Sequence, residues 1–256
     1  MSSNIALRIP TSLPMPEPDA WTRFDALVRS RRAVHQFSAR PVDERDVAAM
    51  LAAARLAPSS FNLQPYAFYW VRTPGLREQL AGLCLNQKAA RTAPELIVCV
   101  ARWDEWRACG EEHLAFLRAQ GVPEATLRFH ADIYAKMRIF FARGPLNVLG
   151  WLRTLAAFML GLQRPILRPP SGPSEHETWA VKSASLACAH AILAAHARGL
   201  DTCPLEGFDS RRVARLLGLP GDRYSLPMIL AVGYRDDTGR IDPQWRRDID
   251  KLVHVL

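Results

Sequence analysis

Residues 57–66, with the sequence Ala-Pro-Ser-Ser-Phe-Asn-Leu-Gln-Pro-Tyr, constrain the fold most because they separate a helix pattern from a strand pattern. Before them, apolar residues between Val47 and Ala54 recur at helical spacing. Pro58 predicts the end of that helix, since proline lacks a backbone donor and restricts the residue before it. After them, residues 66–71 are mostly aromatic or β-branched, as in a pleated strand.

The turn between these two elements is unusually polar, with two hydroxyls and two amides at Ser59, Ser60, Asn62 and Gln64. Side chains of these types often satisfy the backbone groups of a loop that ends a helix. They are equally able to bind a ligand. The residues of the turn alone favour the local interpretation.

Helix and strand patterns continue to alternate along the chain. A continuous apolar run over residues 96–101 predicts a buried strand, and residues 226–234 predict another. Residues 177–198 predict a long helix rich in small residues, which Gly199 ends. Residues 204–208 predict a turn into a further helix with Asp209 as its cap.

The length of 256 residues and the hydrophobic content of 49% fit one large domain. We expect that domain to span residues 21–256, after an extended arm over residues 1–20 that four prolines interrupt. Within it, a helical lid or insert is predicted at about residues 103–175.

Charge and cysteine content narrow the class of protein. The net charge of +8 is scattered and contains no block of like charges, so we expect small anionic ligands and no nucleic acid as partner. The five cysteines are odd in number and lack C-x-x-C spacing, which indicates neither a disulfide framework nor a metal site. A reducing, cytoplasmic setting is the expectation.

Residues 146–162 are almost entirely apolar, with Arg153 near the middle. Because a central arginine is costly in hydrocarbon and about 20 residues are needed to cross it, we expect a buried or lid helix. We therefore expect no membrane partner, although peripheral contact through this helix stays open as an alternative.

Three separate motifs occur in an order that resembles the nitroreductase family of flavoproteins. They are Ser-Arg-Arg-Ala-Val-His-Gln-Phe at residues 30–37, the turn at 57–66, and Gly-Leu-Asp-Thr-Cys-Pro-Leu-Glu-Gly-Phe-Asp at 199–209. The resemblance runs from about Phe24 to the C-terminus. It implies an α+β fold, a nitroreductase-like α-β-α sandwich with a central mixed sheet and long helices, assembled as a homodimer.

The resemblance also implies a set of residues that bind flavin mononucleotide (FMN). Arg31 and Arg32 match phosphate and pyrimidine contacts, Arg247 fits a C-terminal phosphate contact better than Arg246, and the 58–64 turn reaches the partner subunit's flavin. No catalytic side chain is implied, because the backbone of Glu206 and Gly207 lies near the reactive flavin nitrogen. The full set is Arg31, Arg32, Ala33, His35, Pro58, Ser59, Ser60, Asn62, Gln64, Asn86, Lys88, Pro204, Leu205, Glu206, Gly207, Arg246 and Arg247.

Two positions depart from the family pattern. Ala33 replaces a usual serine, and His35 replaces a usual arginine or lysine. A permanent cation stabilises the negative charge of reduced flavin, whereas an imidazole with a pKa near about 6.5 supplies it only in part at neutral pH. Lys88 is the candidate to compensate. From the residues alone, Arg31 and Arg32 also fit a solvated helix end, and Asn86 and Lys88 an ordinary helix boundary.

The resemblance implies an FMN-dependent oxidoreductase that uses NADH or NADPH to reduce a small aromatic acceptor such as a nitroaromatic or quinone, by a ping-pong mechanism. The chain has no G-x-G-x-x-G, P-loop, H-E-x-x-H or G-x-S-x-G motif, so other common enzyme classes are unsupported. Because of Ala33 and His35, a flavin-binding or sequestering protein of the same fold without efficient nicotinamide turnover is the alternative. A peripheral membrane position stays open within that alternative.

Overall fold

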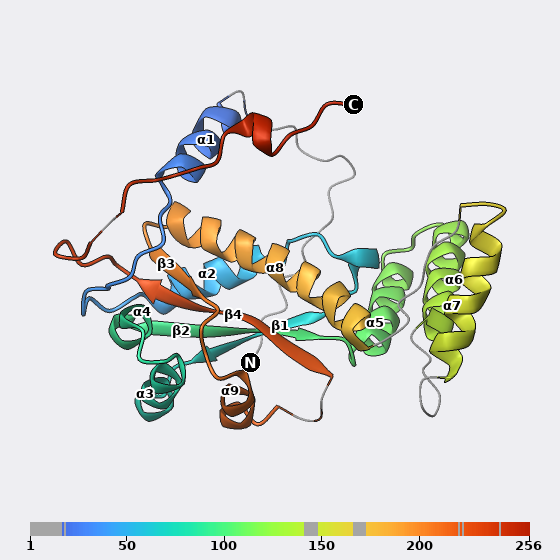
Figure 1. Ribbon diagram of the computed structural model, residues 1–256, viewed down its shortest axis with the longest axis horizontal. Helices are drawn as coiled ribbons and strands as arrows, with labels where there is room; N and C mark the ends of the chain where they lie inside the picture. Colours follow the sequence, from blue (N-terminus) through green and yellow to red (C-terminus); the bar gives the residue numbers. More distant parts are fainter. Residues whose placement is uncertain are drawn as a thin grey trace.

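A four-stranded sheet forms the centre of the molecule, with the strand order β1-β2-β4-β3 (Figure 1). The strands are β1 (Tyr66–Val71), β2 (Glu95–Arg102), β3 (Asp201–Leu205) and β4 (Tyr224–Gly233), and neighbours pair antiparallel. A parallel bridge joins Ala33 to Thr202 at the β3 edge. The computed structural model describes residues 17, 19–140, 148–165, 173–219, 221, 223–240 and 242–256.

The central strand β2 is buried on both faces. Leu96, Val98 and Val100 belong to one hydrophobic cluster, whereas Ile97 and Cys99, which point the opposite way, belong to clusters on the other face. A strand covered on both sides needs no polar alternation, which explains the continuous apolar run in the sequence.

Three helices cover the first face. They are α3 (Pro74–Leu83), α4 (Lys88–Thr92) and α9 (Ser210–Leu216), and their buried side chains pack against β2 and β4. The carboxylate of Asp209 accepts a hydrogen bond from the backbone N–H of Arg212, as expected for the cap of α9.

Two helices cover the second face, α2 (Glu44–Ala54) and α8 (Pro173–Ala197). Small residues such as Ala184, Ala187 and Ala191 are fully buried on α8 and let its backbone approach the sheet. Gly199, with a φ of 76°, follows the end of α8 as predicted. The layers therefore form the predicted α-β-α sandwich.

The two ends of the described chain lie beyond the β3 edge. Helix α1 (Ala20–Ser30) has no buried residue, and Trp21 is 71% exposed. The C-terminal segment contains a 3-10 turn at Ile249–Lys251, and Figure 1 draws it on the same side of the sandwich as α1. Its residues 242–246 line one pocket with Arg31 and Arg32, which follow α1. The arm predicted over residues 1–20 lies almost entirely outside the described residues.

Helices α5 (Trp106–Ala119), α6 (Glu124–Phe140) and α7 (Val148–Gly161) form a projection at one end of the sandwich (Figure 1). The prediction that α7 is helical is confirmed. Of the two expectations for this helix, burial is wrong, because most of its described side chains are exposed, whereas its role as a lid stays a prediction. None of the described helices is long and apolar enough to cross a membrane.

Two other predictions differ from the structure in detail. Helix α2 ends at Ala54, ahead of Pro58, and a 3-10 turn follows at Ser60–Asn62. Residues 204–208 are predicted to form a turn, yet Pro204 and Leu205 belong to strand β3, which begins at Asp201. Proline at position 204 is tolerated there because β3 is an edge strand of the sheet.

Candidate functional site

Residues 31–35 run along the outer edge of β3. The backbone N–H of Val34 donates a hydrogen bond of 3.1 Å to the carbonyl of Thr202, next to the Ala33–Thr202 bridge. The Nδ1 of His35 lies 3.6 Å from the Sγ of Cys203. This pairing fixes the end of α1, and with it Arg31 and Arg32, against the β3 edge.

Three arginines gather at this edge around a pocket of about 290 Å³. Arg31, Arg32 and Arg246 line it together with Ala33 and His35, whereas Arg247 is not among the lining residues. Burial lowers the pKa of Arg31, and the positive charges of Arg246 and Arg32 lower it further. Mutual repulsion of this kind is relieved when an anion binds.

Carboxylates do not neutralise this cluster within the part of the chain that is described. Arg32 donates instead to the main-chain carbonyls of Arg29 and Arg31, at 2.8 and 3.1 Å. The one acidic residue lining the pocket, Asp242, accepts a hydrogen bond of 2.6 Å from Arg240. The guanidinium groups of Arg31, Arg32 and Arg246 therefore remain available to an anionic ligand.

The turn after β3 contacts the connection between α3 and α4. The side-chain amide of Gln87 donates a hydrogen bond of 2.6 Å to the carbonyl of Gly207. A Cβ at position 207 would lie 3.1 Å from that amide nitrogen and would press on the flexible end of the Gln87 side chain. This contact brings Asn86 and Lys88 near Glu206. Gln87 has no predicted role, although it stands between two residues of the predicted set, Asn86 and Lys88.

The 58–64 turn makes its own local hydrogen bonds. The hydroxyl of Ser59 accepts from the backbone N–H of Gln64 at 3.0 Å, and the Gln64 amide donates to the Oδ1 of Asn62 at 3.2 Å. The local interpretation, in which side chains bond backbone groups, is thus correct for Ser59 and for Gln64, whose amide also donates to the Asn62 carbonyl at 3.4 Å. These bonds hold the turn in one shape.

The same turn is attached to the projecting helices by one tyrosine. The hydroxyl of Tyr134 on α6 donates a hydrogen bond of 3.2 Å to the carbonyl of Phe61, and the Nδ1 of His113 on α5 lies 2.6 Å from the same hydroxyl. Because a phenol has one hydrogen, both bonds form together only when His113 carries a proton on Nδ1. No periodic pattern or motif in the sequence predicts this contact.

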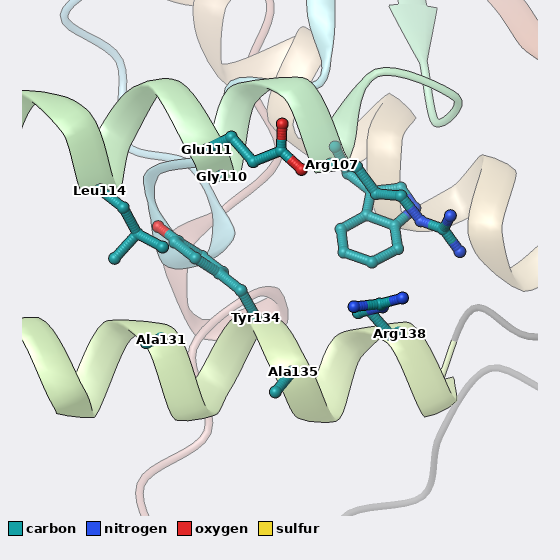
Figure 2. A pocket seen from close by; sticks show the side chains of 9 residues that line it. Arg107, Gly110, Glu111, Leu114, Ala131, Tyr134, Ala135 and Arg138 are labelled. Atoms are coloured by element: carbon teal, nitrogen blue, oxygen red, sulfur yellow. The ribbon is translucent and has the colours of Figure 1, made fainter.

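Tyr134 packs between the two helices. Figure 2 shows its ring extending from α6 toward α5, where Gly110 leaves room for it. A Cβ at position 110 would lie 3.3 Å from the ring. Burial lowers the pKa of His113, and the nearby His130 lowers it further. Leu63, which is fully buried, packs in the same cluster with Tyr134.

Unusual backbone conformations mark two of the predicted segments. Within the described chain, positive φ angles at residues other than glycine occur at Phe61, Asn62, Gln64, Leu85 and Asn86. Each costs on the order of 1 kcal/mol or more and persists when surrounding contacts enforce it. Such strain is typical of binding and active sites. All five positions fall in or beside the segments assigned to the cofactor from sequence.

The predicted residues form two groups at opposite edges of the sheet. Residues 31–35, 86–88, 204–207 and 246 gather at or near the β3 edge, whereas the 58–64 turn leads directly into β1 at the other edge. Three strand spacings separate these edges, which is about 14 Å. Within one chain, therefore, none of the described pockets is lined by residues of both groups.

A comparison with family models decides the identity of the fold. The model of the nitroreductase family matches residues 28–234, most of the chain. The chain belongs to the nitroreductase family. This confirms the family and the oxidoreductase class predicted from the three motifs.

Other nitroreductase-family relatives match this chain along nearly their whole length. It is 27% identical over 223 residues to a protein named NADH dehydrogenase from Thermus thermophilus, covering 87% of this chain and 91% of that protein. It is 26% identical over 235 residues to MhqN of Bacillus subtilis, whose name assigns it as an NAD(P)H nitroreductase, covering 91% and 98%.

Solved structures share the fold of this chain. YdfN of Bacillus subtilis superimposes with a TM-score of 0.70 at 20% identity, covering 92% of this chain and all of that one. A protein from Exiguobacterium sibiricum, assigned as a nitroreductase and solved in complex with FMN, gives a TM-score of 0.66 at 21% identity, covering 91% and 97%. The α-β-α sandwich predicted from sequence is therefore confirmed.

Proposed function

We propose that this protein is an FMN-dependent oxidoreductase that uses NADH or NADPH to reduce a nitroaromatic, a quinone or a related small aromatic acceptor by a ping-pong mechanism. The observation that carries the proposal is the cluster of Arg31, Arg32 and Arg246 around one pocket, where no carboxylate of the described residues pairs with them. A phosphate monoester is the natural ligand of such a cluster, because guanidinium groups bind its oxygens in pairs.

The residues beside this pocket suit the rest of the cofactor. His35 lines the same pocket, and the turn at Glu206 and Gly207 leaves β3 with Gln87 and Lys88 at its side. Glycine at position 207 permits the backbone to approach a planar ring closely. When bound, FMN would supply hydride acceptance and donation, and the protein supplies its position and electrostatic environment.

Two chains are needed to complete the site in this proposal. The 58–64 turn of one subunit would contribute Pro58, Ser59, Ser60, Asn62 and Gln64 to the pocket of the other. The separation of the two groups across the sheet supports a homodimer. So does the apolar face of α1, where Trp21, Phe24 and Val28 are exposed and follow one side of the helix.

The proposed acceptor is small, flat and aromatic, and α5 and α6 would cover its site as a lid. The cytoplasm is the proposed compartment. All five cysteines are free thiols, which is compatible with a reducing environment.

Titration of the purified protein with FMN tests the proposal directly. We expect a yellow complex that oxidises NADH or NADPH only when an acceptor or oxygen is present. Protein that remains colourless after incubation with FMN would refute it. A yellow complex that dithionite bleaches, but that neither nicotinamide bleaches without oxygen, would favour the flavin-sequestering alternative, which Ala33 and His35 motivate.

A further inference from the structure

Helix α7 turns its large apolar side chains toward solvent. Trp151, Leu155 and Phe158 are 74%, 60% and 55% exposed. At 100° per residue they lie on one arc of about 120°, together with Leu152, Met159 and Leu162. Ala157, the one buried side chain among those described on α7, lies on the other side of the helix. A helix of a soluble protein normally has the opposite arrangement.

The chain around α7 is basic. From residue 133 to residue 174 the sequence contains no aspartate or glutamate. The same stretch contains Lys136, Arg138, Arg143, Arg153, Arg164 and Arg168. Of these, Lys136, Arg138 and Arg164 have described side chains, and all three are exposed. Basic residues therefore precede and follow α7 in the sequence, and their positive charge is complementary to an anionic surface.

We propose that α7 docks this protein onto the surface of an anionic lipid bilayer. Its 14 residues extend about 21 Å, too short for the roughly 30 Å of hydrocarbon that a spanning helix crosses. A helix with Trp, Phe and Leu on one arc and basic residues nearby lies in the plane of the membrane interface. The bulky arc enters the boundary between headgroups and acyl chains, and the arginines and lysine contact lipid phosphates. This inference does not depend on the bound cofactor.

Flotation with vesicles tests the docking surface. The full-length protein is mixed with vesicles of phosphatidylcholine containing about a quarter phosphatidylglycerol, and in parallel with vesicles of phosphatidylcholine alone. We expect the protein to float with the anionic vesicles and to remain unbound with the neutral ones. Remaining unbound with both, or binding both equally, would overturn the proposal.

Three substitutions remove half of the apolar arc, including both of its aromatic side chains, without touching the core. Trp151→Gln, Leu155→Gln and Phe158→Gln together should weaken vesicle binding by at least about a hundredfold, because three large side chains no longer enter the bilayer. Their exposure predicts unchanged folding, checked by circular dichroism and thermal unfolding. The matched control is Val253→Gln/Val255→Gln/Leu256→Gln, which also replaces three exposed apolar residues and should bind as the wild type does.

Substitution of the basic residues is a second test of the proposal. Replacing Lys136, Arg138 and Arg164 with glutamine should weaken binding by about fivefold per residue. Light scattering without lipid separates a bilayer from a second copy of the chain as the occupant. If the Trp151→Gln/Leu155→Gln/Phe158→Gln variant has a smaller oligomer than the wild type, or floats as well as the wild type, the proposal is wrong.

Discussion

The two edges of the sheet carry the two halves of the proposed site, and they differ in kind. The β3 edge gathers positive charge, with three arginines around one pocket and no carboxylate pairing them in the described chain. The β1 edge presents a neutral turn whose shape is fixed by its own hydrogen bonds and by Tyr134. The comparison indicates that one edge supplies binding energy through charge, whereas the other supplies orientation through a rigid shape.

Reversing charge at the β3 edge should have the largest effect. Arg31→Glu/Arg246→Glu places two carboxylates where a phosphate would bind, so we expect FMN affinity to fall by about a thousandfold. Isothermal titration measures the loss. Arg118→Glu/Arg128→Glu makes the same change in net charge on exposed parts of α5 and α6 and should leave the affinity within a factor of two to three. Equal losses in both variants would show that overall charge, not the cluster, is responsible.

Removing the hydroxyl of Tyr134 should loosen the 58–64 turn at the β1 edge without unfolding the protein. Tyr134→Phe keeps the ring but deletes the hydrogen bond to the Phe61 carbonyl, and a neutral bond of this kind contributes about 1 kcal/mol. We expect FMN affinity to fall by up to about tenfold, with a shifted flavin absorption spectrum. The matched control is Tyr66→Phe, because the buried hydroxyl of Tyr66 has no hydrogen-bond partner among the described residues.

Unchanged FMN affinity in Tyr134→Phe would mean that the tyrosine acts by packing alone. Gly110→Ala probes that packing, since the new methyl group would press on the Tyr134 ring at 3.3 Å. It should displace the ring and lower FMN affinity more than Tyr134→Phe does.

Relief of backbone strain should stabilise the protein slightly. Leu85 has a φ of 54° and a side chain that is 71% exposed, so glycine at this position loses little buried area. We expect Leu85→Gly to raise the free energy of unfolding by about 1 kcal/mol in urea denaturation without cofactor. Leu76→Gly, at an exposed position inside α3, should lower it by a similar amount. Destabilisation by both variants would contradict strain at Leu85.

The smallest effect concerns pH at the β1 edge. Because burial and His130 lower the pKa of His113 below its usual value of about 6.5, the native state favours the neutral ring. The neutral His113 ring makes its full contribution to the free energy of unfolding above about pH 6.5. This contribution is lost as the pH falls through the lowered native pKa. Comparing unfolding free energies at about pH 7.5 and about pH 5.5 should show a smaller decline in His113→Gln than in the wild type. An equal decline in the two proteins would show that groups other than His113 cause the pH dependence.

Much of the sandwich could be predicted because its signals are local. The apolar run of β2, the small residues of α8 and the stop at Gly199 each follow from the residues of one segment. Strand β3 was missed because it is short and contains Pro204, and its strand character depends on pairing with β4. The exposure of α7 was also missed, since hydrophobicity along a sequence does not reveal which side of a helix meets the protein.

Prediction of the site residues from sequence is limited in the same way. Motif resemblance named Arg31, Arg32 and the turn at 206–207, yet it favoured Arg247 over Arg246, and the structure has Arg246 lining the pocket. The roles of Gln87, His113 and Tyr134 depend on contacts between segments far apart in the chain. Such contacts have no periodic signal, so only the folded structure brings them into view.

Mixing two defective variants tests the central claim of a site built by both edges from two chains. Arg31→Glu/Arg246→Glu and Ser60→Ala/Asn62→Ala each damage one half of every site in their own homodimers. Co-expressed with different affinity tags, they yield a heterodimer with one site that has both halves intact. The shared-site account predicts one FMN per purified heterodimer and about half the activity of the wild type. A heterodimer without bound FMN and without activity would contradict it.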